Sequence, residues 1–340
     1  MTSLENPSSA TEETKRKVII TGGAGTVGQT FIQQYREEFE FHNISRNEAN
    51  IQKLKARYPE VDSHVADIQD LDHLSRLFNK IKPDIVIHTA AFKHVNFAEL
   101  NPSRTVEVNI VGSLNVAKAS IRAGVPIVVG ISTDKACQPE NIYGYSKKIL
   151  EQTFLEHYNE QSRFICTRFA NVACSSGSVI PFWIDSARSG ETLKLTDSRM
   201  NRLMFTMSES AELIRQGIRY AEASTKPFVI GRVMKSVGML ELANLISREF
   251  GDGSKPEIVG IRPGETLNET LVSQQELPYA YYSDNKRYIL LHSDEFGQQR
   301  VTEPLSSLTA EYMSEQEMSA LYANYATPAN AGIKFSSVHT

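Results

Sequence analysis

A glycine-rich turn near the start of the chain strongly limits the folds that this sequence can adopt. Residues 21–28 (TGGAGTVG) follow a short apolar run and precede a helix-forming stretch. Glycines let a backbone turn tightly and approach a pyrophosphate, and the N-terminus of the next helix offers unpaired N–H groups to phosphates. The context predicts a dinucleotide-binding turn made by Gly22, Gly25, Thr26, Val27 and Gly28.

The pattern after this turn predicts a Rossmann-type doubly wound parallel sheet, because short apolar runs alternate with amphipathic stretches. Strands are predicted at residues 17–21, 41–44, 61–65, 85–89, 127–131 and 164–169, with long helices at 102–122 and 143–158. After Asn171 the pattern changes, which indicates a smaller C-terminal substrate-binding lobe.

The predicted domains are interleaved along the chain. The NADP-binding Rossmann domain is expected to comprise residues 16–174 and 203–235, and the substrate-binding lobe residues 175–202 and 236–325. Residues 1–15 are expected to be a flexible lead-in and residues 326–340 a flexible tail.

Composition excludes several classes of protein. A net charge of −4 gives no electrostatic reason to expect nucleic acid as a partner. No apolar stretch approaches the length of a membrane span, and no signal peptide is apparent, so we expect no membrane partner. The three cysteines and eight histidines show no metal-ligand spacing. We therefore expect no metal and a cytoplasmic location with reduced thiols.

The ends of the later strands supply candidate cofactor contacts. Ser45 and Arg46 follow the second strand, where an Arg suits a 2′-phosphate, so NADP is favoured over NAD; the alternative is a solvated surface Arg. Asp67 and Ile68 follow the third strand and suit the adenine, although a helix cap explains Asp67 equally well. Small side chains at Ala90 and Ala91 allow a close approach to the cofactor, and Lys93 reaches toward the ribose or the substrate phosphates.

The strongest chemical signal is a group of proton-transfer residues. Tyr143 and Lys147 lie four residues apart in a predicted helix and so share one face. The ammonium is expected to lower the Tyr143 pKa below its usual value of about 10, which makes a base for a sugar or alcohol hydroxyl. Thr133, Asp134 and Lys135 end a buried apolar run. Hydride transfer alone does not need Asp134 and Lys135, so they indicate further chemistry; the alternative is a simple ion pair.

With these residues the chain resembles an extended short-chain dehydrogenase/reductase of the polysaccharide-biosynthesis type, and specifically the inverting UDP-N-acetylglucosamine 4,6-dehydratases. The similarity spans about residues 17–271. It is carried by residues 21–28, 88–95, 106–116, 132–147, 168–182, 195–206 and 262–269.

The resemblance implies an internal redox elimination on a nucleotide sugar, most simply a UDP-linked one. Tyr143 would take the 4-hydroxyl proton, Lys135 the C5 proton, and Asp134 would protonate the departing 6-hydroxyl. Burial is then expected to raise the Asp134 pKa and to lower the Lys135 pKa. Asn109 would complete a proton path beside the cofactor. Substrate contacts would come from Asn171, Ser178, Val179, Arg202, Arg262 and Glu265. A homo-oligomer, a dimer or larger, is also expected.

Two departures from the family pattern keep other functions open. Tyr145 occupies a position that is usually small in this family, and the segment that contains it resembles the sugar epimerases. Ser176 stands where the family often has an Arg. A nucleotide-sugar 4-epimerase or 4-ketoreductase is the main alternative, because either needs Tyr143 and Lys147 but no C5 base. A cofactor-sensing binding protein without turnover is a further alternative, against which the presence of Tyr143 argues.

Overall fold

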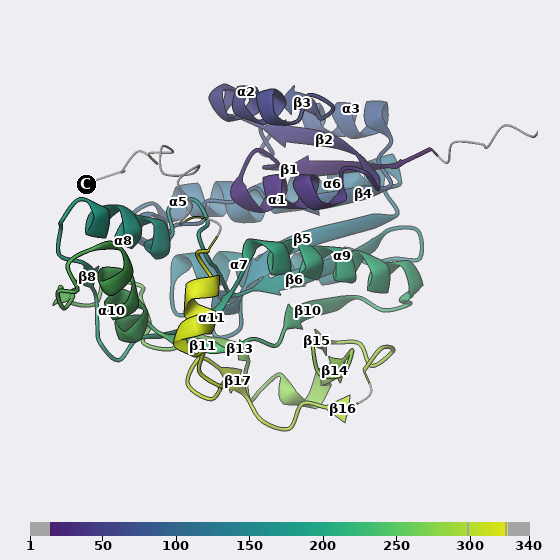
Figure 1. The fold of residues 1–340 in the computed structure, drawn as a ribbon. Coiled ribbons are helices and arrows are strands. Elements are labelled where there is room, and N and C mark those ends of the chain that lie inside the picture. Colours follow the sequence, from purple (N-terminus) through teal and green to yellow (C-terminus); the bar gives the residue numbers. More distant parts are fainter. Residues whose placement is uncertain (1–13, 298, 324, 326–340) are drawn as a thin grey trace, which may run out of the picture.

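The computed structural model, which describes residues 14–297, 299–323 and 325, is built around one ten-stranded sheet (Figure 1). Seven parallel strands run in the order β3–β2–β1–β4–β5–β6–β10, and β15, β14 and β16 continue the sheet in antiparallel pairs. Their bounds are β1 (Arg16–Thr21), β2 (Phe39–Ser45), β3 (Asp62–Val65), β4 (Ile85–His88), β5 (Ile127–Thr133), β6 (Arg163–Phe169), β10 (Phe228–Arg232), β14 (Ala280–Ser283), β15 (Tyr288–Leu291) and β16 (Gln299–Arg300). The strand order reverses between β1 and β4, which confirms the predicted doubly wound fold.

Helices cover both faces of the sheet. On β6, Ile165 lies against Gly217 of α9 (Met207–Ala223), whereas Phe164 stacks edge-on against Phe154 of α7 (Ile142–His157). Alternate residues of a strand point to opposite faces, so α7 and α9 lie on opposite sides. α1 (Thr26–Tyr35) packs beside α9, while α3 (Leu71–Ile81) and α6 (Gly112–Ala123) lie together on the face of α7. The remaining helices of this half are α2 (Glu48–Arg57), α4 (Val95–Leu100) and α5 (Pro102–Thr105).

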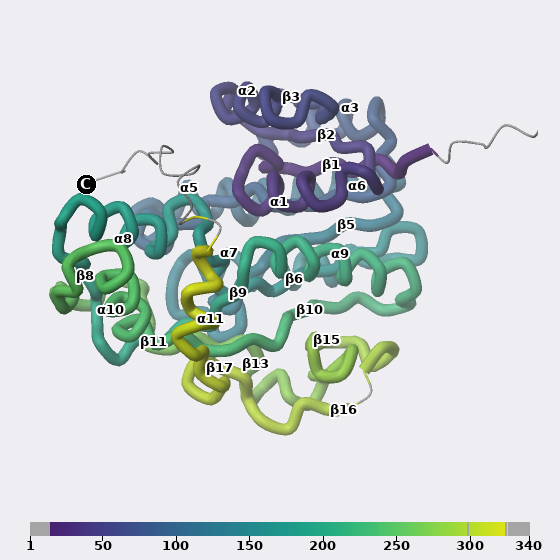
Figure 2. The backbone as a smooth tube through the Cα atoms, viewed as in Figure 1, coloured from purple at the N-terminus to yellow at the C-terminus, as the bar shows by residue number. Residues whose placement is uncertain are grey.

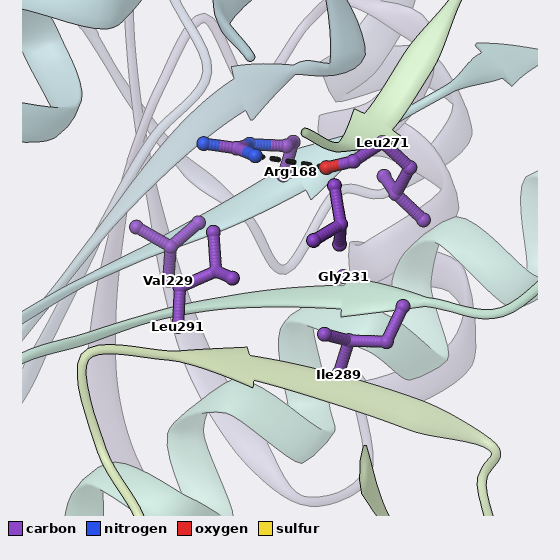
Figure 3. Close-up of a pocket in the computed structure, with 7 residues that line it drawn as sticks. Arg168, Val229, Gly231, Leu271, Ile289 and Leu291 are labelled. Carbon is purple, nitrogen blue, oxygen red and sulfur yellow. Dashed lines mark hydrogen bonds between the residues drawn. The ribbon is translucent and has the colours of Figure 1, made fainter. Parts of the chain in front are cut away.

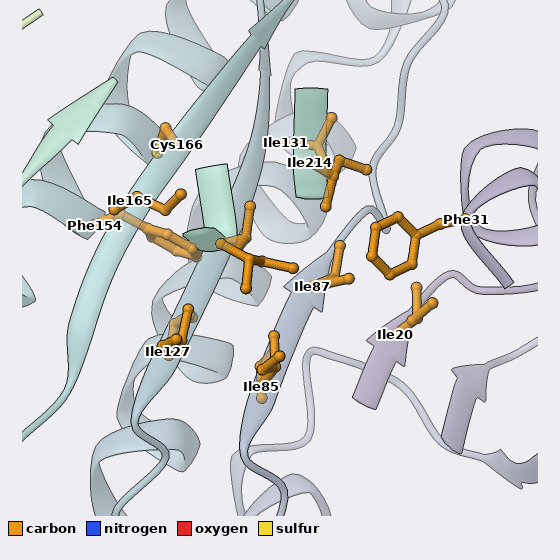
Figure 4. Close-up of a cluster of buried hydrophobic side chains, with 14 of the residues drawn as sticks. Ile20, Phe31, Ile85, Ile87, Ile127, Ile131, Phe154, Ile165, Cys166 and Ile214 are labelled. Carbon is orange, nitrogen blue, oxygen red and sulfur yellow. The ribbon is translucent and has the colours of Figure 1, made fainter. Parts of the chain in front are cut away.

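The main core lies between the sheet and these helices (Figure 4). The central strands are apolar on both faces; β4, for example, is buried at all four positions. Figure 4 shows Phe31 of α1 and Ile214 of α9 beside the isoleucines of β1 and β4. This packing fixes the carboxyl ends of the parallel strands at one edge.

A smaller lobe lies beyond that edge, as the tube in Figure 2 shows, and it has a core of its own. It includes Trp183 of α8 (Val179–Arg188), Leu242 of α10 (Met239–Phe250) and Met318 of α11 (Glu315–Ala320). Short strands complete the lobe and its connections: β7 (Asn171–Val172), β8 (Lys194–Leu195), β9 (Asn201–Phe205), β11 (Ser236–Gly238), β12 (Glu257–Ile258), β13 (Thr270–Val272) and β17 (Leu305–Ser306).

Three local features differ from the sequence expectations. The helix predicted at 102–122 is interrupted by a π-helical turn, Val106–Val111. Helix α8 lies in a region where no element was predicted. Strands β14, β15 and β16, which fall in the range predicted as the substrate-binding lobe, instead extend the large sheet. A turn with positive φ at Asp284, Asn285 and Lys286 folds β14 back against β15 there. The predicted lead-in and tail lie largely outside the described residues.

Candidate active site

The glycine-rich turn connects β1 to α1 and has no room for side chains. Gly22 has φ +76°, and a Cβ there would lie 2.9 Å from Thr89 Oγ1. A Cβ at Gly28 would lie 2.5 Å from the Cα of Gly23, so the helix packs directly on the turn. Gly25 precedes Thr26 and Val27 at the start of α1 without a side-chain cap, which leaves N–H groups for a ligand. This cradle fits the pyrophosphate of a dinucleotide.

The next two strand ends are joined through the predicted cofactor residues. Arg46 Nη1 lies 3.1 Å from Asp67 Oδ2, and both side chains are partly exposed. Asn115 Nδ2 of α6 donates to the carbonyl of Ile68 at 3.1 Å and so fixes this loop. Ser45 Oγ donates to Asn43 Oδ1 at 2.8 Å, beneath the glycine-rich turn.

The end of β4 is fixed by Asn109, which lies in the π-helical turn. Its amide nitrogen donates to the Phe92 carbonyl and to Ser146 Oγ, and its Oδ1 accepts from the Phe92 N–H at 2.7 Å. Asn109 therefore holds the loop that carries Ala90 and Ala91 against α7. Lys93, at the end of this loop, donates from Nζ to the Ser176 carbonyl at 2.7 Å.

The end of β5 carries a buried acid–base centre, defined here as Thr133, Asp134, Lys135 and Glu269. Thr133 Oγ1 donates to Asp134 Oδ1 at 2.9 Å. Lys135 Nζ lies 3.2 Å from the same oxygen and 2.7 Å from Glu269 Oε1. As a carboxylate, Asp134 leaves its Oδ2 without a hydrogen-bond donor among the described residues. A protonated Asp134 removes that cost, because it can donate a hydrogen bond to Glu269.

The protonation states of this centre follow from burial and charge. Burial, then the Glu269 charge, raises the pKa of Asp134, in the predicted direction. For Lys135 the prediction of a lowered pKa is wrong. Burial acts in that direction, but the charges of Asp134 and Glu269 outweigh it and raise the pKa. Glu269 is the reverse case: burial opposes its ionisation, yet Lys135 and Arg202 lower its pKa.

Tyr143 and Lys147 lie at the start of α7, beside this centre. Burial raises the pKa of Tyr143 to about 12, and Lys135 and a hydrogen bond with Thr133 oppose that shift. Lys147 Nζ instead donates to the Ile131 carbonyl at 2.8 Å, and burial lowers its pKa to about 8. The prediction that Lys147 lowers the Tyr143 pKa is therefore wrong: burial raises this pKa, and Lys135 is the cation that acts against the rise.

The residues predicted to hold the substrate divide into two groups. Ser178 and Val179 begin α8, where the N-cap makes no side-chain hydrogen bond and Ser178 Oγ has no partner in the described chain. Asn171 and Arg202 instead contact Glu269. Arg202 also donates to the carbonyls of residues 201, 266 and 267.

Arg262 and Glu265 face each other across an exposed turn. The Arg262 N–H donates to Glu265 Oε2 at 3.0 Å, and the Glu265 N–H donates back to the Arg262 carbonyl at 3.1 Å. The guanidinium of Arg262 lies on the surface, so these contacts organise the turn through backbone groups.

Sequence reasoning missed Glu269 as a member of the site. It lies more than 130 residues beyond Lys135, and the antiparallel pairing of β13 with β17 places it there. The signal that marks it is its place as the last residue of the matching segment 262–269.

A second buried ion network, the Arg168 network, lies on the other side of β5. The Arg168 guanidinium makes two hydrogen bonds to each of Glu151 and Glu276. It makes a fifth to the Leu271 carbonyl, which Figure 3 shows. Ser132 Oγ donates to Glu151 Oε1, and Cys137 Sγ lies 2.9 Å from Glu276 Oε2. The network therefore holds both sides of the turn that carries Asp134 and Lys135.

Comparison with known proteins establishes the family. The model of a family described as polysaccharide biosynthesis protein matches residues 18–303. The chain belongs to this family. Over 285 residues it is 31% identical to the UDP-N-acetylglucosamine 4,6-dehydratase (inverting) of Campylobacter jejuni. The aligned region covers 80% of this chain and 81% of that protein. It is also 33% identical over 281 residues to the capsular polysaccharide biosynthesis protein CapD of Staphylococcus aureus, covering 78% of this chain and 46% of CapD.

Solved structures share this fold. Pen from Bacillus thuringiensis superposes with a TM-score of 0.83 at 26% identity, over 91% of this chain and 97% of Pen. DesIV, a dTDP-glucose 4,6-dehydratase from Streptomyces venezuelae with NAD and TYD bound, has a TM-score of 0.64 at 23% identity, over 74% and 86% of the two chains. The latter likeness supports the fold. The predicted resemblance to the short-chain dehydrogenase/reductases is confirmed.

Two further observations concern membranes and metals. No helix in the described ranges has the length and apolar character needed to cross a bilayer. Within the same ranges, no three His, Cys, Asp or Glu side chains come together in an arrangement that could hold a metal ion.

Proposed function

We propose that this protein is a nucleotide-sugar 4,6-dehydratase. Its substrate would be UDP-N-acetylglucosamine, converted to a UDP-4-keto-6-deoxy-N-acetylhexosamine with inversion at C5. The observation that carries the proposal is the contact between Asp134, Lys135 and Glu269 beside Tyr143, since only an elimination needs an acid and a second base there. The similarity to the inverting dehydratase of Campylobacter jejuni supports the same reaction.

Each residue of the centre has one proton to move. Tyr143 takes the proton of the sugar 4-hydroxyl, and Thr133 holds the 4-oxygen. A nicotinamide cofactor held at the glycine-rich turn would supply the transfer of hydride from C4 to C6. The C4 ketone acidifies the C5 proton, which Lys135 removes, while Asp134 protonates the departing 6-hydroxyl. Lys147 holds the nicotinamide ribose. A proton that returns to the opposite face of C5 inverts that centre.

For the cofactor we propose NADP in preference to NAD. Arg46 is placed at the end of β2, where a 2′-phosphate would lie, and its present partner Asp67 is a partly exposed carboxylate. An Arg46→Ala variant is expected to lose preference for NADP and to keep binding of NAD. Fluorescence titration with both cofactors tests this.

The substrate would lie between the strand ends and the smaller lobe. The start of α8, at Ser178 and Val179, suits the diphosphate, because its N–H groups are uncapped. Lys93, Asn171, Arg202, Arg262 and Glu265 complete the proposed substrate contacts. In the absence of substrate, Lys93, Asn171 and Arg202 are engaged by protein atoms, so binding would exchange some of these contacts.

The alternative is a 4-epimerase or 4-ketoreductase. It is favoured by the Tyr143-Gly144-Tyr145-Ser146-Lys147 segment and by 28% identity to the UDP-glucose 4-epimerase of Rickettsia canadensis over 78% of this chain. Neither reaction uses a C5 base, so the contacts of Lys135 with two carboxylates favour the dehydratase.

Proton NMR of the purified enzyme with UDP-N-acetylglucosamine in deuterium oxide tests the proposal. A new C6 methyl signal with deuterium at C5 is the expected result, and its couplings report the configuration at C5. A change confined to the C4 proton would overturn the dehydratase in favour of epimerisation.

We also propose that the protein forms a homo-oligomer. The helices around residues 100–150 present apolar side chains to solvent, namely Leu100, Val106, Val111, Tyr145 and Ile149. Light scattering that finds a monomer at all concentrations would contradict this proposal. The cytoplasmic location stays a prediction.

A further inference from the structure

Glu269 is a buried carboxylate that contacts Lys135 of the acid–base centre and two proposed substrate residues, Asn171 and Arg202. Its side chain is 3% exposed, and Oε1 lies 2.7 Å from Lys135 Nζ and 3.3 Å from Arg202 Nε. Asn171 donates to Oε2. On the backbone, the Glu269 N–H donates to Ser307 Oγ, and the Ser307 N–H donates to the Glu269 carbonyl. Both ends of the residue are therefore fixed, and the carboxylate is aimed at Lys135.

The proposed reaction requires a free amine at Lys135, but the structure holds this group as an ammonium between two carboxyl groups. A base of this kind works only if its own proton first moves to a neighbour. The Asp134 carboxyl is needed as the acid and is favoured in its protonated form. Glu269 also contacts Lys135, and because it is ionised it can accept the Lys135 proton.

We propose that Glu269 accepts the Lys135 proton and so makes Lys135 a base, acting through Lys135 as a proton-holding and positioning residue. This inference rests on the proposed dehydratase function. In the resting centre Lys135 is an ammonium, Glu269 a carboxylate and Asp134 a neutral acid. Substrate binding displaces water, and in the resulting low dielectric a neutral amine and carboxylic acid replace the ion pair.

The protons balance over one turnover. Lys135 passes its proton to Glu269, takes the C5 proton, and Asp134 gives its proton to the departing hydroxyl, which leaves as water. Lys135 then returns a proton to C5 and recovers its own from Glu269. The proton that Tyr143 took from the 4-hydroxyl passes through Thr133 to Asp134, along the Thr133–Asp134 hydrogen bond. Tyr143 begins and ends as a phenolate; burial disfavours this form, and the positive charge of an oxidised nicotinamide would favour it. Every other group also ends as it began.

The charged neighbours make the pH dependence specific. Glu269 faces Lys135, Asp134 and Arg202, and Lys135 faces Asp134, Glu269 and, at longer range, Arg202. Because the Glu269 charge raises the pKa of Asp134, its removal lets Asp134 ionise at lower pH. An enzyme that needs protonated Asp134 then loses activity at lower pH than the wild type does.

The test compares Glu269→Gln with Glu269→Asp, which keeps the charge, and with Glu276→Gln, which removes a different buried carboxylate. In Glu269→Gln we expect deuterium exchange at C5 to fall about 100-fold or more, and the high-pH limb of kcat/KM to move down by about one unit. Formation of reduced nicotinamide from substrate, which depends on Tyr143, is retained. In Glu269→Asp we expect the high-pH limb of kcat/KM to lie at the wild-type position, and in Glu276→Gln we expect it not to move.

Three results would overturn the inference. They are wild-type C5 exchange in Glu269→Gln, an unmoved limb in that variant, or a Glu269→Asp enzyme that behaves like Glu269→Gln. If Glu269→Gln does not fold, carbon NMR of wild-type carboxyl groups decides, since Glu269 must then be ionised and Asp134 protonated below neutral pH. A wild-type enzyme that forms no methyl product would instead overturn the dehydratase function itself, so the two failures are distinguishable.

Discussion

The acid–base centre and the Arg168 network are both buried and charged, but they differ in how completely their charges are paired. In the Arg168 network, the guanidinium is satisfied by two glutamates and a carbonyl. In the acid–base centre, Asp134 Oδ2 finds no hydrogen-bond donor within the described part of the chain, and two carboxyl groups share one lysine. Moving a proton within a fully paired network would break existing hydrogen bonds and charge pairs, whereas in an underpaired network proton transfer can improve the pairing. The comparison separates a structural site from a reactive one in the same protein.

The two networks meet on β5 through adjacent residues. Ser132 donates to Glu151 of the Arg168 network, and Thr133 donates to Asp134. Successive residues of a strand point to opposite faces, so one strand end serves both networks. The Arg168 network then fixes the backbone on which the reactive side chains depend.

The largest effect is expected from removing the reactive lysine. Lys135→Gln should lower the rate of methyl formation about 10³-fold, because the C5 proton then has no base, while the fold is retained. NMR of the product measures the rate, and circular dichroism checks the fold. A Lys135→Gln enzyme that exchanges the C5 proton at the wild-type rate would contradict the reactive role of this centre.

Breaking the paired network should cost stability instead. Arg168→Met leaves the buried Glu151 and Glu276 with only the partly exposed Lys148 as a cation, and we expect the free energy of unfolding to fall by about 3 kcal/mol. Urea denaturation measures this. Arg168→Lys is the matched control, since it keeps one charge and loses the two-pronged geometry. A loss below about 1 kcal/mol in Arg168→Met would remove the distinction between the networks.

The sequence predicts the parts of the molecule that depend on local patterns. The apolar runs and the glycine-rich turn give the parallel strands and the dinucleotide cradle, because strand burial and tight turns leave local signatures. Thr133, Asp134, Lys135 and Tyr143 are also found together, as their short separation in the chain suggests.

Contacts between distant segments are what the sequence does not show. Glu269 reaches Lys135 through the pairing of β13 with β17, and the charges of Asp134 and Glu269 together reverse the expected direction of the Lys135 pKa. Arg202 is a plausible diphosphate ligand by type, yet backbone carbonyls of residues 266 and 267 occupy its guanidinium. A pKa or a free donor depends on all neighbours, and those are set by tertiary structure.

The pH dependence of stability should separate the two networks. The folded state binds the Asp134 proton more tightly than the unfolded chain does. This tighter proton binding stabilises the fold fully below about pH 4, and the stabilisation is lost as the pH rises through the raised pKa of Asp134. Asp134→Asn should therefore be more stable than the wild type at pH 8, by about 1–2 kcal/mol.

The contribution of the Arg168 network to folding stability changes with pH in the opposite direction. Arg168, against the effect of burial, lowers the pKa of Glu276 to about 2, so its contribution is present above about pH 4.5 and is lost as pH falls toward 2. Thermal unfolding of wild type, Asp134→Asn and Glu276→Gln across pH measures both slopes. An Asp134→Asn variant that parallels the wild type from pH 4 to 8 would show that Asp134 is not protonated in the fold.

The smallest effect is expected where the networks meet. Ser132→Ala removes the hydrogen bond to Glu151 and should lower stability by about 1 kcal/mol, with little change in kcat/KM. A double-mutant cycle sharpens the comparison, since only residues of one network should couple. We expect Ser132→Ala to be non-additive with Arg168→Lys in unfolding free energy and additive with Asp134→Asn. Non-additivity with Asp134→Asn would mean that β5 transmits strain between the networks, and the paired one would then tune the reactive one as well as support it.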